Sequence, residues 1–225
     1  MIIDFHSHIL PKLDHGSDSV ETSLAQLDFA RKAGVDTVIA TSHFYPHMHN
    51  AIAFFEKRAD SYNELMLAAQ DREIPKIVLG AEVLVCEGIN KLPDLELLAI
   101  EGTKSILLEL PFGLNISEAY INTLESICES GFDIILAHAD RYDPKNIERI
   151  LPCGAKIQLN ASAFSHLTVK KHIKKWIDKG LVVALGSDIH KADQSAYKKF
   201  NRAISRLGVA APIIMEASYN LINKK

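Results

Sequence analysis

Cysteine is scarce in this chain and never occurs in a CxxC pair. The 225 residues contain three cysteines, Cys86, Cys128 and Cys153. Isolated cysteines in apolar surroundings are typical of reduced structural thiols, so we expect no disulfide framework. Cys86, in the stretch VLVCEG, also lacks the glycine-rich loop and following arginine that would activate a thiolate toward an anion. A catalytic cysteine is therefore disfavoured.

The sequence also lacks a strong charge of one sign and any long hydrophobic run. Its formal net charge is −3 and its isoelectric point is about 6.4, which does not favour nucleic acid or an anionic membrane as a partner. The amino-terminal MIIDFHSHIL carries no basic region before its apolar residues, and no apolar run is long enough to span a bilayer. We therefore expect a cytoplasmic protein that neither inserts into a membrane nor binds nucleic acid.

The sequence does contain ample material for a folded core. Hydrophobic residues make up 48% and charged residues 24%, which are ordinary values for a globular domain. No internal repeat, low-complexity segment or linker rich in proline, glycine and serine divides the chain. We expect residues 1–225 to form a single domain.

Short apolar runs alternate with segments of helical periodicity along the chain. This alternation is typical of βαβ units with a parallel sheet, and seven such strands favour an α/β barrel. The predicted strands are 2–6, 36–43, 76–83, 105–110, 133–138, 155–160 and 182–188. Helices are predicted at 20–33, 51–71, 117–130, 144–151, 168–179, 195–207 and near 212–223. The stretch 84–104 has no clear pattern and is left unassigned.

Histidine and acidic residues gather where the predicted strands end. Six of the seven strands finish at such a residue, and in α/β barrels the loops after the strands converge on one mouth where active sites are built. The candidate metal ligands, with Asp14 from the first loop, are His6, His8, Asp14, His43, Glu82, Glu109, His138, Asp188 and His190. Mixed imidazole and carboxylate ligands suit zinc, iron or manganese, and nine candidates exceed the needs of one ion. The sequence therefore predicts two or three divalent metal ions.

Each motif alone has a less specific interpretation. Two histidines in an HxH pair are usually ordinary side chains, and GSDIH could be a helix cap followed by an exposed histidine. The placement of all the candidates at strand ends favours the metal site. The other histidines do not share this placement, and we expect surface or loop roles for them, with the second HxH contributing at most to the rim. These are His15, His47, His49, His166 and His172.

Six motifs resemble those of a known family and occur in its order. They are DFHSHILPKLDHGSDS at the amino terminus, TSH, GAEV, LLELP, AHADRY and GSDIH. The chain resembles the polymerase-and-histidinol-phosphatase (PHP) superfamily, and within it the bacterial manganese-dependent protein-tyrosine phosphatases encoded with capsule and exopolysaccharide systems. The resemblance implies a distorted (β/α)7 TIM-like barrel with a trinuclear centre. It also implies manganese as the metal, with iron or zinc as alternatives.

The resemblance further implies a division of the ligands among three ions. One ion would be held by His6, His8, Glu82 and Asp188, a second by Glu82, Glu109 and His138 with Glu82 bridging, and a third by Asp14, His43 and His190. Metal ions in such a site can clamp a phosphate monoester and activate a water, without a covalent intermediate.

Three residues are candidates for direct catalytic roles. Arg141, three residues after His138, could offer a bidentate fork to phosphoryl oxygens, and we favour this role over the alternative, a surface ion pair with Asp140 or Asp143. A phenol leaves with a pKa of about 10, so a tyrosine substrate needs little help from an acid. Asp14 or His190 could protonate the leaving group if one were required.

The sequence departs from the family pattern at a few positions. Lys12 and His15 stand where relatives carry a small residue and an acid, and no arginine follows the GSDIH motif. Single lysines could replace that arginine as point charges but not as a planar fork. The candidates are Lys191, Lys198 and Lys199.

Three functions remain open at this point. The first is dephosphorylation of a phosphotyrosine-bearing protein, such as a bacterial tyrosine kinase that controls polysaccharide synthesis. The second is hydrolysis of a small ester such as histidinol phosphate. The third is a non-catalytic regulatory module that keeps its metals for stability, which the complete ligand set opposes. The sequence leaves a homo-oligomer open.

Overall fold

The computed structural model describes residues 1–113 and 116–223. Its strands form two parallel sheets, with the orders β1-β2-β4 and β3-β5-β6-β7-β8-β9. The strands of the described residues are β1 (Ile3–Ser7), β2 (Thr37–Ala40), β3 (His43–Phe44), β4 (Lys76–Leu79), β5 (Glu82–Leu84), β6 (Ser105–Glu109), β7 (Asp133–Leu136), β8 (Lys156–Asn160) and β9 (Val182–Gly186). Hydrogen bonds of 3.0 Å from His8 N to Ile189 O and 2.8 Å from Asp188 N to His6 O join the end of β1 to the segment after β9. The sheets therefore close into a barrel, which confirms the predicted α/β architecture.

The prediction was wrong about two strands, which it treated as continuous. The segment 36–43 breaks into β2 and β3, and 76–83 breaks into β4 and β5. In each case the first half belongs to the three-stranded sheet and the second half to the six-stranded sheet. The breaks lie where the barrel wall turns from one sheet into the other, and strands that change sheets bend at such corners. If each broken pair counts as one strand, the described barrel has the seven strands expected.

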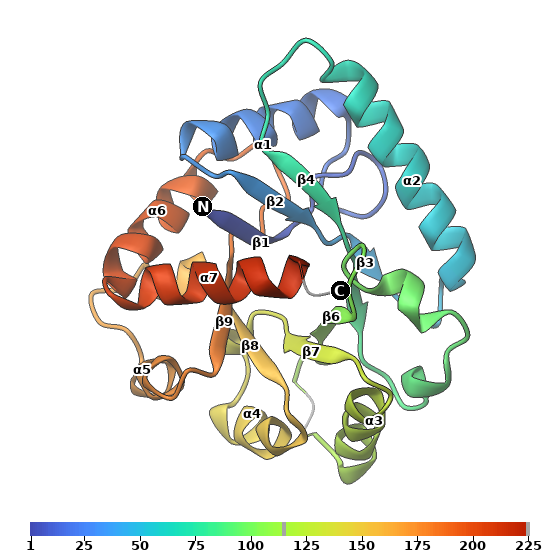
Figure 1. The fold of residues 1–225 in the computed structure, drawn as a ribbon, viewed down its shortest axis with the longest axis vertical. Coiled ribbons are helices and arrows are strands. Elements are labelled where there is room, and N and C mark those ends of the chain that lie inside the picture. The colour runs from blue at the N-terminus through green and yellow to red at the C-terminus, as the bar shows by residue number, and fades with distance from the viewer. Residues whose placement is uncertain (114–115, 224–225) are drawn as a thin grey trace.

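Helices cover the outside of the barrel (Figure 1). They are α1 (Val20–Lys32), α2 (Ala51–Ala68), α3 (Glu118–Glu129), α4 (Pro144–Ile150), α5 (Lys171–Asp178), α6 (Ser195–Leu207) and α7 (Ala210–Asn223). All begin and end within three residues of their predicted bounds, because their starts carry clear signals. Ser19 and Asn50 cap α1 and α2 by accepting backbone N–H bonds, and Pro144 opens α4. The unassigned stretch 84–104 holds two short 3₁₀ helices, Ile89–Lys91 and Leu95–Leu98.

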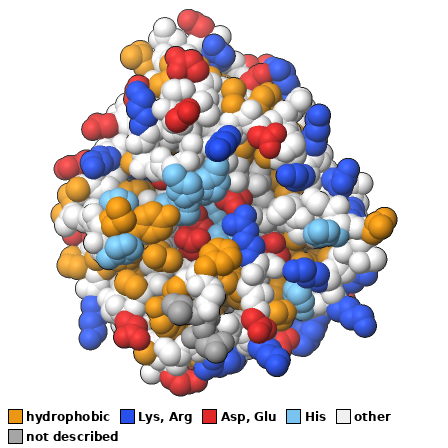
Figure 2. Space-filling model, turned by 180° about the vertical axis from the view of Figure 1, so that it is seen from behind, with side chains coloured by type: hydrophobic (Ala, Val, Ile, Leu, Met, Phe, Trp, Pro, Cys, Tyr) orange, Lys and Arg blue, Asp and Glu red, His pale blue; other side chains and the backbone are white. Residues whose placement is uncertain are grey.

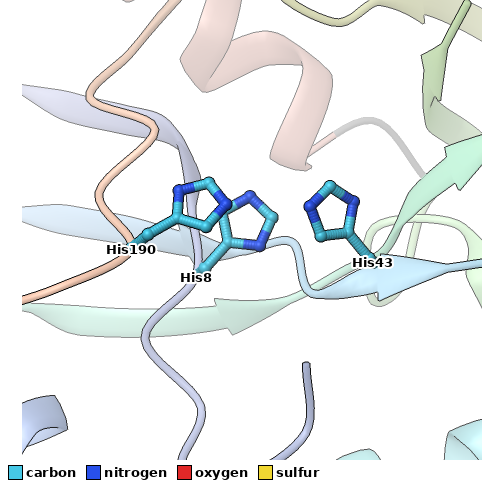
Figure 3. Close-up of side chains that lie close together, drawn as sticks. All are labelled: His8, His43 and His190. Atoms are coloured by element: carbon cyan, nitrogen blue, oxygen red, sulfur yellow. The ribbon is translucent and has the colours of Figure 1, made fainter. Parts of the chain in front are cut away.

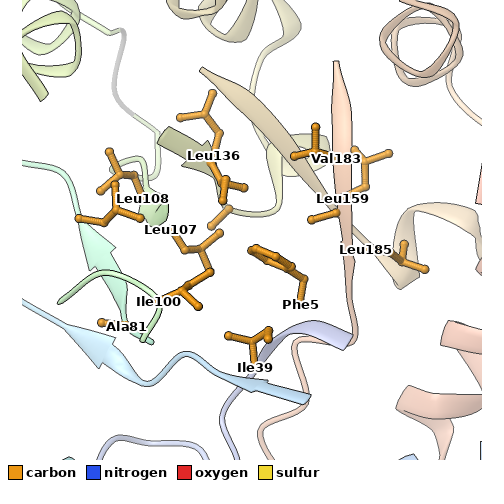
Figure 4. Close-up of a cluster of buried hydrophobic side chains, with 14 of the residues drawn as sticks. Phe5, Ile39, Ala81, Ile100, Leu107, Leu108, Leu136, Leu159, Val183 and Leu185 are labelled. Carbon is orange, nitrogen blue, oxygen red and sulfur yellow. The ribbon is translucent and has the colours of Figure 1, made fainter. Parts of the chain in front are cut away.

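Apolar side chains from the strands fill the interior of the barrel. Figure 4 shows Phe5 among Ile39, Leu107, Leu136 and Leu159, all fully buried. Strands that are buried on both faces need such continuous apolar runs, which explains why they were legible in the sequence.

The carboxyl-terminal helix α7 lies across the amino ends of the strands. Figure 1 shows it crossing in front of the barrel, where Ser218 Oγ donates to Val183 O over 2.8 Å and Ser105 Oγ donates to Leu221 O over 3.1 Å. The carboxyl ends of the strands therefore open on the opposite face. Among the described residues, no helix is both long and apolar enough to cross a membrane.

Candidate metal centre

Histidine and acidic side chains meet in a hollow on the face opposite α7 (Figure 2). His6 and His8, which end β1 or follow it, are fully buried with their Nε2 atoms 3.1 Å apart. Asp188 Oδ1 lies 3.5 Å from His6 Nε2 and 3.4 Å from His8 Nε2. Residues 180 positions apart in the sequence thus converge because β1 and β9 close the barrel.

Glu82 occupies the middle of this cluster. Its Oε2 atom lies 3.1 Å from His6 Nε2 and 3.1 Å from His43 Nδ1, and its Oε1 atom lies 2.8 Å from His138 Nε2. The side chain is fully buried, yet Oε2 has no hydrogen-bond partner in the part of the chain described. Buried carboxylate oxygens are rarely left unsatisfied. An unsatisfied oxygen surrounded by ring nitrogens is what a metal-bridging carboxylate would present.

Three groups of side chains bring their ligand atoms within 4.8 Å of one another. They are His6, His8 and Asp188; His43, Glu82 and Glu109; and His8, His43 and His190. Figure 3 shows the rings of the third group side by side. Imidazole nitrogens and carboxylate oxygens at this density suit divalent transition metals, so the residues fit the metal centre that the sequence predicted. His138 adjoins the second group, with its Nε2 atom 3.5 Å from Glu109 Oε1.

Asp14 lies behind the cluster rather than in one of these groups. Its Oδ2 atom accepts hydrogen bonds from His8 Nδ1 over 2.8 Å and from His43 N over 2.9 Å, and its Oδ1 accepts from Gly16 N over 2.8 Å. A carboxylate bonded to one ring nitrogen fixes the orientation of the other, here His8 Nε2, toward the centre. A Cβ on Gly16 would lie 2.4 Å from His8 Cβ, so only glycine fits this turn.

Two of the candidate ligands have unusual backbone conformations. His138 follows β7 with φ of 32°, and Asp188 follows β9 with φ of 54°. Residues with a side chain seldom adopt this left-handed region, and strain of this kind is concentrated at functional sites. The sharp turns end the strands and direct both side chains into the hollow.

The sequence did not indicate the contribution of β8, which corresponds to the one predicted strand, 155–160, that ends without a candidate ligand. Gln158 Oε1 accepts the backbone N–H of His138 over 2.6 Å and lies 3.1 Å from His6 Nδ1. Asn160 Nδ2 donates to Asp188 Oδ2 over 3.0 Å. These amides orient the candidate ligands without belonging to their groups. The available signal was two amides inside the buried run AKIQLN.

His15 is exposed, as expected, but it is not remote from the centre. Its ring stacks against His43 at a centroid distance of 4.6 Å and lies 4.7 Å from the ring of His190. The second HxH lies beside the mouth, with His47 and His49 centroids 6.1 Å and 6.0 Å from that of Tyr45. The rim role predicted for this pair fits that position.

Four histidines of the cluster fall into two kinds, those whose pKa is raised by neighbouring carboxylates and those whose pKa is lowered. Burial opposes protonation, but Asp14 and Asp188 raise the pKa of His8 well above its usual value, and Glu109 and Glu82 raise the pKa of His138 to about 9. Burial lowers the pKa of His43 to about 3, and burial together with the positive charge on His8 lowers that of His190 to about 4. His43 and His190 are therefore neutral near pH 7, the form that binds metals.

The carboxylates of the cluster stay ionised despite their burial. Burial opposes ionisation, but His6 and His138 hold the pKa of Glu82 well below its usual value. The same balance lowers the pKa of Asp188, with His6 and His8 as the main partners, and that of Asp14, with His8. The centre therefore offers anionic oxygens at neutral pH.

Arg141 contacts the centre directly. Its Nη2 atom lies 2.5 Å from Asp188 Oδ2, and its side chain is 38% exposed. Among the described residues the alternative ion pair with Asp140 or Asp143 does not form; Asp140 Oδ1 accepts the backbone N–H of Asn160, and Asp143 caps α4. The guanidinium therefore lies at the mouth.

Aromatic side chains line another part of the mouth. Phe112, in the loop after β6, is 62% exposed, with its ring centroid 5.4 Å from that of Tyr142 and 6.3 Å from that of His138. Tyr142 is fixed by a hydrogen bond from its hydroxyl to Leu110 O over 2.9 Å. Tyr45 stacks on His43 at 5.2 Å.

The cysteines show no sign of activation. All three are free and partly buried. Burial raises the pKa of Cys86, and burial together with the neighbouring Cys153 raises the pKa of Cys128 to about 12. A thiolate nucleophile would need the opposite shift.

Comparison with known proteins identifies relatives along the whole chain. The sequence family described as "Capsular polysaccharide synthesis, CpsB/CapC" matches residues 2–207. The tyrosine-protein phosphatase CpsB of Streptococcus pneumoniae is 28% identical over 100% of this chain and 90% of its own length.

Solved structures that share the fold include two phosphatases. One, described as that of YwqE from Bacillus subtilis and CpsB from Streptococcus pneumoniae, unique metal-dependent tyrosine phosphatases, superposes with a TM-score of 0.81 at 20% identity and covers 100% of this chain and 95% of that one. The other is a histidinol phosphate phosphatase of Lactococcus lactis complexed with zinc, L-histidinol and phosphate. It has a TM-score of 0.55 at 15% identity over 92% of this chain and 94% of that one.

Proposed function

The chain belongs to the CpsB/CapC family of capsular polysaccharide synthesis, and from this premise we propose that it is a metal-dependent tyrosine-protein phosphatase whose active site is the histidine and carboxylate cluster. The observation that carries the proposal is the environment of Glu82, a buried carboxylate with ring nitrogens of His6, His43 and His138 within 3.1 Å of its oxygens. Such a concentration of ionised and unsatisfied groups costs stability unless cations bind there. It has no purpose in a purely structural barrel.

The ligand set of the proposal follows the three groups of the cluster. The side chains that would hold the ions are His6, His8, His43, Glu82, Glu109, His138, Asp188 and His190, with Asp14 either as a ligand or as the carboxylate that orients His8. When bound, divalent ions supply charge stabilisation for phosphoryl oxygens and activate a water near neutral pH. Manganese is the proposed ion, with iron and zinc as alternatives, because this mixture of ligands accepts all three.

Arg141 is proposed to bind the substrate phosphoryl group. Its guanidinium already contacts a carboxylate of the cluster at 2.5 Å and remains partly exposed, so an incoming phosphate can accept a bidentate pair of hydrogen bonds from it. Asp14 and His190 are the candidates for protonating a leaving group, but near pH 7 Asp14 is ionised and His190 is neutral, so either would first have to take up a proton. A tyrosine phenol, with a pKa of about 10, depends less on such an acid than an alkyl alcohol does.

The aromatic rim supports a phosphotyrosine substrate over histidinol phosphate. Phe112 leaves a mostly exposed ring beside His138, and Tyr142 supports that ring from behind. A phenyl ring whose phosphate reaches the cluster can pack against Phe112 in an edge-to-face or offset arrangement. An aliphatic phosphate would gain less from this surface. The likeness to the histidinol phosphate phosphatase concerns the fold alone.

The proposed substrate is a phosphotyrosine-bearing protein, namely a bacterial tyrosine kinase that controls capsule or exopolysaccharide synthesis. The mouth lies on the open face of the barrel, where an extended protein segment can reach it (Figure 2). The proposal also includes a cytoplasmic location and a single domain over residues 1–225, as expected from the sequence.

The test is phosphate release from a phosphotyrosine peptide and from histidinol phosphate by the purified protein, with added Mn²⁺ or with a chelator. The proposal predicts metal-dependent release from the peptide, abolished in His138→Ala. Preference for histidinol phosphate would indicate that the enzyme hydrolyses a small phosphate ester rather than a phosphorylated protein. Absence of release from both substrates by metal-loaded protein would contradict the phosphatase assignment.

A further inference from the structure

A cleft leads away from the metal cluster on the side of β8 and β9. It has a volume of about 300 Å³ and is lined by Asn160 and Ser162 from the end of β8 and the loop after it, and, in the segment after β9, by residues 187–191, Asp193, Ala196 and Lys199. Asp188, His190 and Arg141, which belong to the proposed active site, line this cleft together with Lys191 and Lys199. The cleft is therefore continuous with the proposed active site.

The two lysines of this cleft make no close ion pair, although Lys191 interacts electrostatically with Asp18 and Lys199 with Asp193. Within the described residues, neither Lys191 nor Lys199 has a carboxylate oxygen within 4.0 Å of its ammonium nitrogen, whereas other exposed lysines such as Lys32 and Lys175 do. Asp193 is the one acid that lines the cleft besides Asp188. Its oxygens accept hydrogen bonds from Ser195 N over 2.8 Å and Ser195 Oγ over 2.5 Å. The cleft thus presents two ammonium groups that no carboxylate of the described residues contacts directly.

The carboxylate of Asp188, which also lines the cleft, already accepts hydrogen bonds from neighbouring side chains. Asp188 Oδ2 accepts hydrogen bonds from Arg141 Nη2 and Asn160 Nδ2, at 2.5 Å and 3.0 Å. The other polar side chains that line the cleft are those of Lys191, Lys199 and Ser162, which can donate hydrogen bonds, together with Ser187 and His190. An anionic group with several acceptor lone pairs is the complementary ligand.

Resting on the proposed function, we propose that this cleft is a subsite for an acidic side chain next to the phosphotyrosine of the substrate. With the phosphotyrosine at the cluster, the adjacent residue of an extended chain lies about 3.8 Å away along the backbone, within reach of the cleft. The cleft has room for a Glu or Asp side chain, whose carboxylate meets Lys191 and Lys199. The enzyme therefore prefers phosphotyrosine in an acidic sequence.

A different role for the lysines would give a different pattern. If Lys199 bound the phosphoryl group itself, every phosphorylated substrate would depend on it equally. If it binds a neighbouring carboxylate, only peptides that carry this carboxylate depend on it. The ratio of affinities for acidic and neutral peptides separates the two roles.

The experiment measures binding without turnover. Metal-loaded protein is titrated with fluorescent peptides in which phosphonomethylphenylalanine, a non-hydrolysable analogue of phosphotyrosine, is flanked by Glu or by Gln on its amino-terminal or carboxyl-terminal side. We expect the better Glu peptide to bind about fivefold more tightly than its Gln counterpart, the effect of exposed charge pairs at two lysines. The preference should disappear at about 1 M salt, where the Debye length is about 3 Å.

Lys199→Glu is the test variant and Lys198→Glu its matched control. Lys198 is also exposed on α6 but does not line the cleft. We expect Lys199→Glu to remove or invert the preference for Glu, and Lys198→Glu to retain it. Because both variants change the net charge equally, a general electrostatic effect cannot produce this difference.

The outcomes are distinct from those that test the phosphatase assignment. Equal binding of Glu and Gln peptides to the wild-type protein would overturn the subsite. The subsite would also be overturned if Lys199→Glu lowered the affinity for the Glu and Gln peptides by the same factor. An equal loss of the preference for Glu in Lys198→Glu would overturn it as well. Hydrolysis of the corresponding phosphotyrosine peptides is scored separately, so the binding preference can stand or fail whether or not turnover is seen.

Discussion

The two ends of the barrel are built from the same strands but treat polar groups in opposite ways. At the amino ends, α7 buries Ile214 and Met215, and the buried hydroxyl of Ser218 has a backbone carbonyl as its partner. At the carboxyl ends, His6, His8 and Glu82 are buried as completely, but they contact mainly one another. The amino end is therefore organised for stability, whereas the carboxyl end is where active sites of α/β barrels are built, and its residues are suited to binding cations.

This contrast explains why a barrel can carry such a cluster. Buried ionised groups destabilise a fold unless each has a partner, and the apolar interior together with α7 must offset that cost. Substitutions at the two ends should consequently separate activity from stability.

The largest effect is expected from Glu82→Gln. The substitution keeps the shape of the side chain but removes the charge that faces His6, His43 and His138. We expect kcat/KM for a phosphotyrosine peptide to fall on the order of a thousandfold, since metal-assisted charge stabilisation is worth several kcal/mol. Steady-state kinetics with circular dichroism as a check of folding would measure it. Retention of most activity would break the contrast between the two ends.

The second-largest effect is a loss of stability from a substitution at the amino end of the barrel. Ile214→Ala in α7 removes a side chain that is 3% exposed. We expect the free energy of unfolding to fall by about 2–4 kcal/mol from lost burial and the cavity left behind. Denaturant titration measures this loss, and kcat of the folded enzyme should stay at the wild-type value. A large drop in kcat would show that packing at the amino end affects catalysis at the carboxyl end, contrary to the proposed separation of stability and activity.

Gln158→Leu tests the amide that supports the cluster. Its loss leaves His6 Nδ1 and the His138 N–H without their common partner, so we expect metal affinity to fall about 10- to 100-fold, as for other groups that orient metal ligands. Competition with a fluorescent chelator measures the affinity.

Gln26→Leu is the matched control for this substitution. Gln26 is fully buried in α1, and neither polar atom of its side chain has a hydrogen-bond partner among the residues described. The control should leave metal affinity unchanged. Equal losses in both variants would point to a general packing effect.

The smallest effect is expected at the aromatic rim. Phe112→Ala should reduce the ratio of kcat/KM for a phosphotyrosine peptide to that for an alkyl phosphate by up to about tenfold, the range of aromatic pair energies. A phenol leaves more readily than an alkyl alcohol, but this difference affects the ratio equally in the variant and in the wild-type enzyme, so it cancels when the two ratios are compared. Tyr219→Ala on α7, an exposed aromatic at the opposite end, should leave the ratio unchanged. An unchanged ratio in Phe112→Ala would remove the support that the rim gives to tyrosine.

Much of the fold could be predicted because its signals are local. Continuous apolar runs identified the strands, and caps such as Ser19 and Asn50 marked the helix starts. The breaks after Ala40 and Leu79 were not predictable in this way, because they arise from the meeting of two sheets. The sequence within each run does not show which partner a strand will have.

For the candidate site, the residues at the strand ends could be predicted, but the contacts made by the loops could not. The residues at strand ends converge as expected, because all parallel strands finish at the same face. The partner of Arg141 and the stacking of His15 on His43 depend on how loops fold back over that face. The same is true of Gln158, whose amide is informative only once β7 and β1 are known to lie beside it.

The most direct test of the central claim is an anomalous diffraction experiment on crystals grown with manganese. We expect two or three strong peaks among the imidazoles and carboxylates at the carboxyl ends of the strands, next to Glu82, and none beneath α7. Peaks confined to other parts of the molecule, or a cluster without any peak in crystals of active enzyme, would contradict this claim.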